Sequence, residues 1–178
     1  MNQKILVVYK SVTGFTKRYA QWISEELGCE TGELKEVSAE KLGEYQVILF
    51  GGGFHAGLVD GLKQAKALYE KSGAERLIVF ATGATPGTET DMIEAAWKNN
   101  LTAEELMRIP HFYMESGLRY DNMPFRDKLM LKMFHAMIKG KKDKTEYEKA
   151  RAKALGNSYD HSSREYIKPL LKWVQQEL

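Results

Sequence analysis

Val7-Val8-Tyr9-Lys10-Ser11-Val12-Thr13-Gly14-Phe15-Thr16 joins a predicted strand to a predicted helix. The strand prediction rests on residues 5–9, a short apolar run rich in β-branched side chains, as in buried strands. The helix prediction rests on large apolar side chains at helical spacing: Phe15, Tyr19, Trp22, Ile23 and Leu27. The stretch therefore predicts a buried strand, a hydroxyl-rich loop and an amphipathic helix, in that order.

The loop between this strand and helix has the composition of a phosphate site. The first N–H groups of a helix lack partners within it and lie at the positive end of its dipole, so they attract an anion. The hydroxyls of Ser11, Thr13 and Thr16 surround that position and can complete the coordination of one phosphate. A helix that is merely capped by these hydroxyls is the alternative interpretation.

Two better-known phosphate loops do not fit these residues. The Walker loop has a lysine directly after its last glycine, whereas this loop continues Gly14-Phe15-Thr16. The dinucleotide fingerprint has three spaced glycines, and this loop has one. A hydroxyl-lined loop without an inner lysine suits a phosphate monoester that stays bound rather than one that is transferred.

The same stretch resembles the signature of the flavodoxin family. That signature reads aliphatic, aliphatic, aromatic, any, Ser, any two, Gly, any, Thr, any three, Ala, any two, aliphatic. The chain matches all of its fixed positions, with Val7, Val8, Tyr9, Ser11, Gly14, Thr16, Ala20 and Ile23. The resemblance implies that the cofactor is flavin mononucleotide (FMN). Its phosphate would then be held by Ser11, Val12, Thr13, Gly14, Phe15 and Thr16.

Strands and helices alternate along the rest of the chain. Apolar runs predict further strands at 31–37, 45–50, 76–80 and 111–114. The alternation predicts an α/β fold with a five-stranded parallel sheet and helices on both faces. Its expected strand order is 2-1-3-4-5, as in flavodoxins, within one flavodoxin-like domain over residues 1–178. In such a sheet, ligands bind beyond the carboxyl ends of the strands.

Two further loops rich in glycine or hydroxyl residues follow the third and fourth predicted strands. Glycines let a backbone approach a ligand closely. One side of the flavin ring is expected to be bordered by Gly53, Phe54, His55, Ala56 and Gly57, where a flipping peptide can bond reduced flavin. The other side and the pyrimidine edge are expected to be bordered by Thr82, Gly83, Ala84, Thr85 and Pro86.

His55 and Arg119 are the candidate catalytic residues. A histidine beside the flavin can donate a hydrogen bond to its anionic reduced form; the alternative is a surface histidine with no such role. Arg119, at the mouth of the fifth predicted strand, pairs either with an acidic substrate or reduced flavin, or with a nearby carboxylate. Phe54 is the candidate stacking ring because the loop at 82–86 lacks an aromatic residue. An open ring face is the alternative, and it suits direct hydride transfer to a bound substrate.

The chain changes character beyond Tyr120, where a Met-rich, helical and basic segment spans about 124–178. Residues 125–139 predict a helix with a wide apolar face, and a basic run at 139–144 follows it. Either this helix packs as core, or residues 125–144 form a basic amphipathic surface that contacts an anionic membrane or admits an apolar substrate. A capping box is predicted at Thr145 and Glu148.

Part of this region resembles menaquinone-dependent protoporphyrinogen dehydrogenases, which are flavodoxin-like flavoproteins. The resemblance covers Gly117-Leu118-Arg119-Tyr120, Phe125-Arg126-Asp127-Lys128 and the helix that continues from them. It implies an enzyme with a quinone as electron acceptor. Three hypotheses follow: an FMN protein for electron transfer or oxidoreduction, a protoporphyrinogen dehydrogenase-like enzyme, and a phosphate-binding α/β module without flavin.

Composition limits the partners. The chain has 178 residues and a formal net charge of +2, and a near-neutral surface weakens the case for docking onto basic redox proteins. A redox partner protein or a quinone-like small molecule is expected. Nucleic-acid binding is not, because the basic run lacks interleaved aromatic residues. With one cysteine, no metal-ligand spacing, no visible signal peptide and no membrane-length apolar run, a cytoplasmic protein is expected.

Overall fold

A computed structural model describes residues 4–121, 123, 125–140 and 157–178. These residues form two compact units, Met1–Ser116 with Ser162–Leu178, and Gly117–His161, which we describe separately. The capping box predicted at Thr145 and Glu148 and most of the basic run at 139–144 lie outside the described residues. The prediction of a single domain over the whole chain stays a prediction.

The first unit is built on a parallel sheet in the strand order β2-β1-β3-β5-β6. Each neighbouring pair in that order runs parallel. The strands are β1 (Ile5–Lys10), β2 (Glu30–Glu33), β3 (Val47–His55), β5 (Arg76–Gly83) and β6 (His111–Glu115). This confirms the predicted order 2-1-3-4-5 for the parallel strands. A short strand not predicted from the sequence, β4 (Leu58–Val59), pairs antiparallel with the end of β3.

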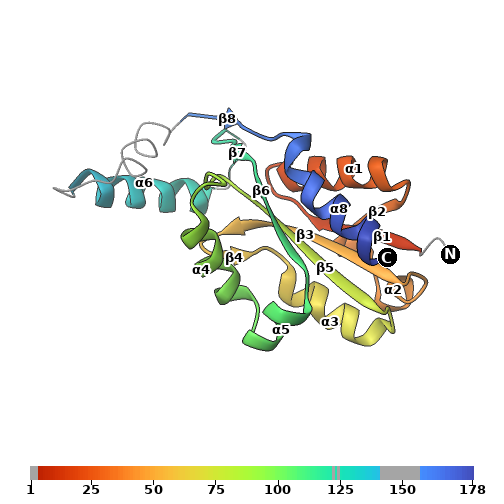
Figure 1. The fold of residues 1–178 in the computed structure, drawn as a ribbon. Coiled ribbons are helices and arrows are strands. Elements are labelled where there is room, and N and C mark those ends of the chain that lie inside the picture. Colours follow the sequence, from red (N-terminus) through yellow and green to blue (C-terminus); the bar gives the residue numbers. More distant parts are fainter. Residues whose placement is uncertain (1–3, 122, 124, 141–156) are drawn as a thin grey trace. The chain divides into compact units, whose positions relative to one another are not determined.

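Helices cover both faces of this sheet (Figure 1). One face carries α1 (Phe15–Leu27) and α8 (Lys168–Glu177), and the other carries α3 (Leu62–Ser72), α4 (Thr90–Asn100) and α5 (Ala103–Arg108). The remaining short helices are α2 (Ala39–Leu42), η1 (Leu34–Glu36) and η2 (Arg164–Ile167). The α/β architecture with helices on both faces is therefore confirmed.

Each central strand contributes to two hydrophobic clusters, because alternate side chains point to opposite faces. In β1, Val7 packs toward α1 and α8, while Leu6 and Val8 pack toward the other helices. Val7, Leu49 and Ile78 are fully buried at the centre of three neighbouring strands. Burial on both faces explains why the sequence shows continuous apolar runs here.

Two element boundaries differ from the prediction. The strand expected at 31–37 ends at Glu33, and the η1 turn follows it. The strand expected at 45–50 continues through Gly51-Gly52-Gly53 to His55, because these glycines keep their ladder pairing with β1 and β5. At the end of the chain, Pro169 lies in the first turn of α8, where its missing N–H has no helical partner to lose.

The described residues of the second unit include a two-stranded antiparallel sheet and a helix. The strands are β7 (Gly117–Leu118) and β8 (Tyr159–Asp160), and the helix is α6 (Phe125–Gly140). Several large apolar side chains of α6 are exposed: Phe125, Leu129, Met130, Met133 and Met137. None of the helices in the described residues is long and apolar enough to cross a membrane.

Candidate functional site

Three segments of the first unit meet at the carboxyl edge of the sheet. The Thr16 hydroxyl, in the first turn of α1, lies 2.9 Å from the Thr82 hydroxyl near the end of β5, and both are buried. Gly53 of β3 stands opposite Thr82 in the ladder. A Cβ atom on Gly53 would lie 3.8 Å from Thr16 Oγ1. The predicted phosphate loop and the two predicted ring-bordering segments are thus adjacent.

The predicted phosphate loop turns sharply into α1 at Gly14. Gly14, at the N-cap of α1, has φ 90°, a left-handed conformation that favours glycine. Its N–H donates to the Ser11 hydroxyl at 3.2 Å, which folds Ser11 back over the start of the helix. The first turn of α1 contains no acidic residue, so the helix itself places no carboxylate at the positive end of its dipole. Hydroxyls and helix N–H groups are the donors that suit a phosphate monoester.

The glycine run at 51–53 serves two different purposes. A Cβ atom on Gly51 would lie 2.0 Å from the Phe80 ring, and one on Gly52 would lie 2.4 Å from the Asp60 carbonyl oxygen. Both glycines are therefore required by packing within the protein. Gly53 alone has room around its Cα, with no atom closer than 3.8 Å to a Cβ placed there. The expectation of a backbone that approaches a ligand thus applies to Gly53 and not to its two neighbours.

The predicted wall at 54–57 is a tight hairpin between β3 and β4. Ala56 and Gly57 form its two-residue turn, and both have positive φ, 51° and 80°. Positive φ at both central residues is what the common two-residue hairpin turn requires. The left-handed region is unfavourable for Ala56, which carries a Cβ atom. The hairpin must therefore be stabilised by contacts elsewhere.

Asn100, the last residue of α4, holds this hairpin. Its Nδ2 donates to the carbonyl oxygens of Gly57 at 2.8 Å and Ala96 at 2.7 Å. Its Oδ1 accepts the Val59 N–H at 2.7 Å. The role of Asn100 could not be predicted from the sequence, because nothing in the local pattern links the end of α4 to a turn more than forty residues earlier.

Phe54, one of the residues predicted to border the flavin ring, packs against two aromatic side chains. Its ring packs edge-on against Trp97, with centroids 5.1 Å apart, and stacks on Tyr113 at 5.7 Å. The side chain thus packs against the cluster beneath α4. The structure gives Phe54 a packing role, and stacking on a flavin stays a prediction.

The two candidate catalytic residues lie in different units. His55 is 41% exposed at the end of β3, with Nδ1 3.9 Å from Asp60 Oδ1. Its Nε2 atom is buried, so the exposed part of the side chain does not include this nitrogen, and a donor role toward a ligand stays a prediction. Arg119 lies in the second unit, where its guanidinium is 3.9 Å from the Asp160 carboxylate. This pairing matches the carboxylate alternative considered for Arg119 from the sequence.

The loop after β5 is held by residues of β6 and by the residue that follows it. The Tyr113 hydroxyl donates to the Thr85 carbonyl oxygen at 2.7 Å, and the Ser116 N–H donates to the Gly83 carbonyl oxygen at 2.7 Å. The Glu115 carboxylate accepts the Gly87 N–H at 2.9 Å. These three bonds hold Gly83, Thr85 and Gly87, which alternate with Ala84 and Pro86 along the loop.

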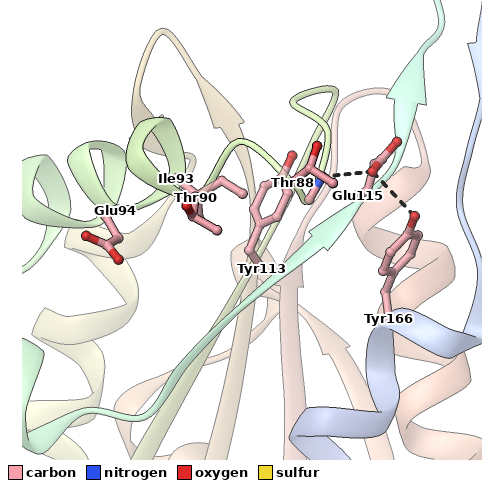
Figure 2. Close-up of a pocket in the computed structure, with 8 residues that line it drawn as sticks. Thr88, Thr90, Ile93, Glu94, Tyr113, Glu115 and Tyr166 are labelled. Carbon is pink, nitrogen blue, oxygen red and sulfur yellow. Dashed lines mark hydrogen bonds between the residues drawn. The ribbon is translucent and has the colours of Figure 1, made fainter.

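A cavity of about 500 Å³ lies beside this loop. Figure 2 shows the Tyr113 ring between the start of α4 and the Glu115 carboxylate, which also accepts from the Tyr166 hydroxyl at 3.4 Å. Burial, and after it the charge of Glu115, raises the pKa of Tyr166. The lining residues are Gly87, Thr88, Thr90, Ile93, Glu94, Tyr113, Glu115 and Tyr166.

The predicted site did not include Tyr113, Glu115 and Tyr166. Tyr113 and Glu115 could have been predicted from the alternation of side chains along β6. Tyr113 and Glu115 are alternate residues at the carboxyl end of that strand, so they share one face at the edge where the ligand was expected. Within the part of the chain that the structure describes, no three His, Cys, Asp or Glu side chains gather where they could hold a metal ion.

A parallel sheet with helices on both faces defines an α/β protein of the doubly wound class, in which ligands bind beyond the carboxyl ends of the strands. Residues 6–145 match the sequence profile of the flavodoxin domain. The chain therefore belongs to the flavodoxin family, and its cofactor is FMN, as the signature at 7–23 predicted. No curated protein sequence matches the chain.

Solved structures similar to this chain include flavodoxins and other flavoproteins. An archaeal flavodoxin is 16% identical with a TM-score of 0.39, over 85% of this chain and 96% of the other. A flavoprotein from Lactobacillus acidophilus in complex with FMN is 17% identical with a TM-score of 0.39, over 64% and 92%. A WrbA-like flavodoxin from Agrobacterium tumefaciens is 14% identical with a TM-score of 0.42, over 86% and 93%.

Proposed function

We propose that FMN binds non-covalently where the three segments meet, and that the protein uses it for electron transfer or oxidoreduction. The observation that carries this proposal is the contact of the Thr16 and Thr82 hydroxyls beside Gly53. It brings the phosphate loop and both ring-bordering segments to one place. Bound FMN supplies one- and two-electron chemistry, and the protein supplies position and electrostatics.

The phosphate is assigned to the loop at 11–16. The helix dipole and the N–H groups at the start of α1 favour its charge, and the hydroxyls of Ser11, Thr13 and Thr16 supply neutral donors. No lysine lies within this loop, so the phosphate is held by dipoles and hydrogen bonds. Such a site binds a phosphate monoester without activating it for transfer.

The flavin ring is assigned to the space between the hairpin at 54–57 and the loop at 82–86. Gly53 leaves room between them because it carries no side chain. His55, at the start of the hairpin beside Asp60, is the side chain assigned to the part of the ring where negative charge develops on reduction. The hairpin is fixed by Asn100 and the loop by β6, so both borders are defined before a cofactor binds.

The decisive experiment is a flavin titration of the purified full chain. We expect a yellow protein, or an apoprotein that quenches FMN fluorescence on binding. Thr13→Ala should weaken FMN by about 1–2 kcal/mol, the value of a hydrogen bond to a charged group, and leave riboflavin unchanged because it lacks the phosphate. A protein that binds neither flavin contradicts the proposal. If Thr13→Ala weakened the binding of FMN and riboflavin equally, the phosphate would have to bind at another position.

A second candidate is an oxidoreductase that acts on an apolar acceptor such as a quinone. The observation that favours it is the apolar face of α6, on which Phe125 is 80% exposed, Met133 66% and Met137 64%. Lys128 and Lys132 lie on the same helix, and basic residues next to an apolar face favour an anionic membrane surface. The resemblance to protoporphyrinogen dehydrogenases belongs to this candidate, and the cytoplasmic location stays a prediction.

Two measurements test this candidate. The flavin-loaded protein is assayed with menaquinone analogues and with protoporphyrinogen. No reaction with either would contradict this candidate and leave electron transfer as the proposed function. Sedimentation with vesicles of one part anionic to three parts neutral lipid tests the helix. Met133→Asp should abolish sedimentation, while Met107→Asp, at a methionine of α5 that is 84% exposed, should not. Equal sedimentation of both variants contradicts membrane contact through α6.

A further inference from the structure

The carboxyl end of β6 acts as a template for the loop that follows β5. Tyr113, Glu115 and Ser116 bond to Thr85, Gly87 and Gly83 respectively, so three neighbouring positions fix alternate residues of the loop. The loop at 83–87 is therefore held by three bonds from residues outside it, two from side chains and one from the backbone.

Glu115 is the member of this template that connects the loop to other elements. Its carboxylate oxygen Oε2 accepts both the Gly87 N–H at 2.9 Å and the Tyr166 hydroxyl of η2 at 3.4 Å. Its carbonyl oxygen accepts the Tyr19 hydroxyl of α1. The same Tyr19 oxygen accepts the Ser163 N–H at 3.1 Å. Through one residue, the loop is connected to α1 and to η2, the turn that leads into α8.

We infer that Glu115 is a positioning residue for the cofactor: its carboxylate fixes the loop that borders the flavin ring, and its charge lowers the reduction potential of the bound flavin. This inference rests on the proposed placement of FMN. Reduction adds negative charge at the ring, and a fixed carboxylate nearby opposes it. Glu94 and Glu115 are the charged residues that line the adjacent cavity, and no basic side chain lines it among the described residues.

The position of the loop is tested without flavin. In the apoprotein, Glu115→Ala should speed exchange of the Gly87 amide hydrogen at least tenfold by NMR, because the acceptor of that N–H is gone. Glu115→Gln keeps an acceptor oxygen and should leave the exchange rate near that of wild type. Glu94→Gln, on the exposed face of α4 beside the same cavity, is the matched control and should change nothing. Unchanged Gly87 exchange in Glu115→Ala overturns the positioning role.

The effect on the cofactor is tested with FMN and riboflavin. Glu115→Ala should weaken both flavins by about the same factor, because the ring border is altered and the phosphate site is not. Glu115→Gln should keep the affinity for oxidised flavin and shift the midpoint potential to a more positive value. Tyr166→Phe should not reproduce this positive shift, because the carboxylate and its charge remain.

The possible failures are distinguishable. A Glu115→Gln potential equal to wild type, or equal to that of Glu94→Gln, overturns the electrostatic part of the inference. Loss of FMN alone in Glu115→Ala, with riboflavin unaffected, overturns the assignment of the loop to the ring. A wild-type protein that binds no flavin overturns the proposed function, and with it the effect on potential. The Gly87 exchange rate still decides whether Glu115 positions the loop.

Discussion

The hydroxyl of Thr16 lies 2.9 Å from the hydroxyl of Thr82, although 66 positions separate the two residues in the chain. One belongs to the first turn of α1 and the other to the end of β5. Both residues are 3% exposed, so bulk water is excluded and each hydroxyl depends on the other as a hydrogen-bond partner. The contact links the part of the site assigned to phosphate with the part assigned to the ring.

Replacing either threonine should therefore destabilise the protein even without a cofactor. Thr82→Val leaves the Thr16 hydroxyl buried beside a methyl group, which should lower the free energy of unfolding by about 1–3 kcal/mol. In the double variant Thr16→Val with Thr82→Val, the loss in the free energy of unfolding should be smaller than the sum of the losses in the two single variants. No buried hydroxyl is then left without its partner. Urea unfolding of the apoproteins measures this. Strictly additive losses would show that the two hydroxyls do not interact.

Asn100 offers a second test, at the hairpin. Asn100→Ala removes three hydrogen bonds and leaves the Val59 N–H and the Gly57 carbonyl without these partners. We expect a loss of about 1–3 kcal/mol in the free energy of unfolding and weaker flavin binding. Asn99→Ala, the neighbouring exposed position, is the control and should stay within about 0.5 kcal/mol of wild type. A stable Asn100→Ala protein with a normal hairpin would refute the holding role.

The glycine run allows folding and binding to be separated. Gly51→Ala should prevent stable folding, because its Cβ atom would overlap the Phe80 ring in the core. Gly53→Ala should fold with stability near that of wild type but bind FMN more weakly, since its methyl group would enter the space assigned to the cofactor. Circular dichroism and flavin titration distinguish the two effects. Normal FMN affinity in Gly53→Ala would place the ring elsewhere.

Cys29 gives a prediction about pH. Burial raises the pKa of its thiol from the ordinary value of 9.0 to about 11. Above pH 9 the unfolded chain loses this proton while the folded protein keeps it, so stability is full below pH 9 and falls between pH 9 and 11. The free energy of unfolding of Cys29→Ala should fall less steeply than that of wild type over that interval, as measured by urea unfolding at a series of pH values. Parallel curves would contradict the role of the thiol.

The first strand, loop and helix could be predicted from the sequence because their determinants are local. Apolar periodicity, the glycine at position 14 and the hydroxyls around it all lie within one short segment. The strand order followed from the alternation of elements and the family resemblance. The predicted strand order also places Thr16, Gly53 and Thr82 close together, because the carboxyl ends of parallel strands meet at one edge of the sheet.

The parts that were missed depend on contacts between distant segments. The turn at Ala56 and Gly57 lacks the usual asparagine or aspartate before glycine, so β4 gave no hairpin signal. The role of Asn100 is visible only once α4 lies beside that turn. The glycines at 51–53 are indistinguishable in the sequence, although Gly51 is required by a phenylalanine from another strand.

The two borders of the proposed ring site are each held by bonds from outside themselves, the hairpin by Asn100 and the loop by Tyr113, Glu115 and Ser116. Such preorganisation reduces the conformational entropy that a binding site loses when its ligand arrives. The apoprotein should therefore resemble the flavin-loaded form closely at these segments. Variants that loosen either border should then release the flavin faster while capturing it at nearly the same rate.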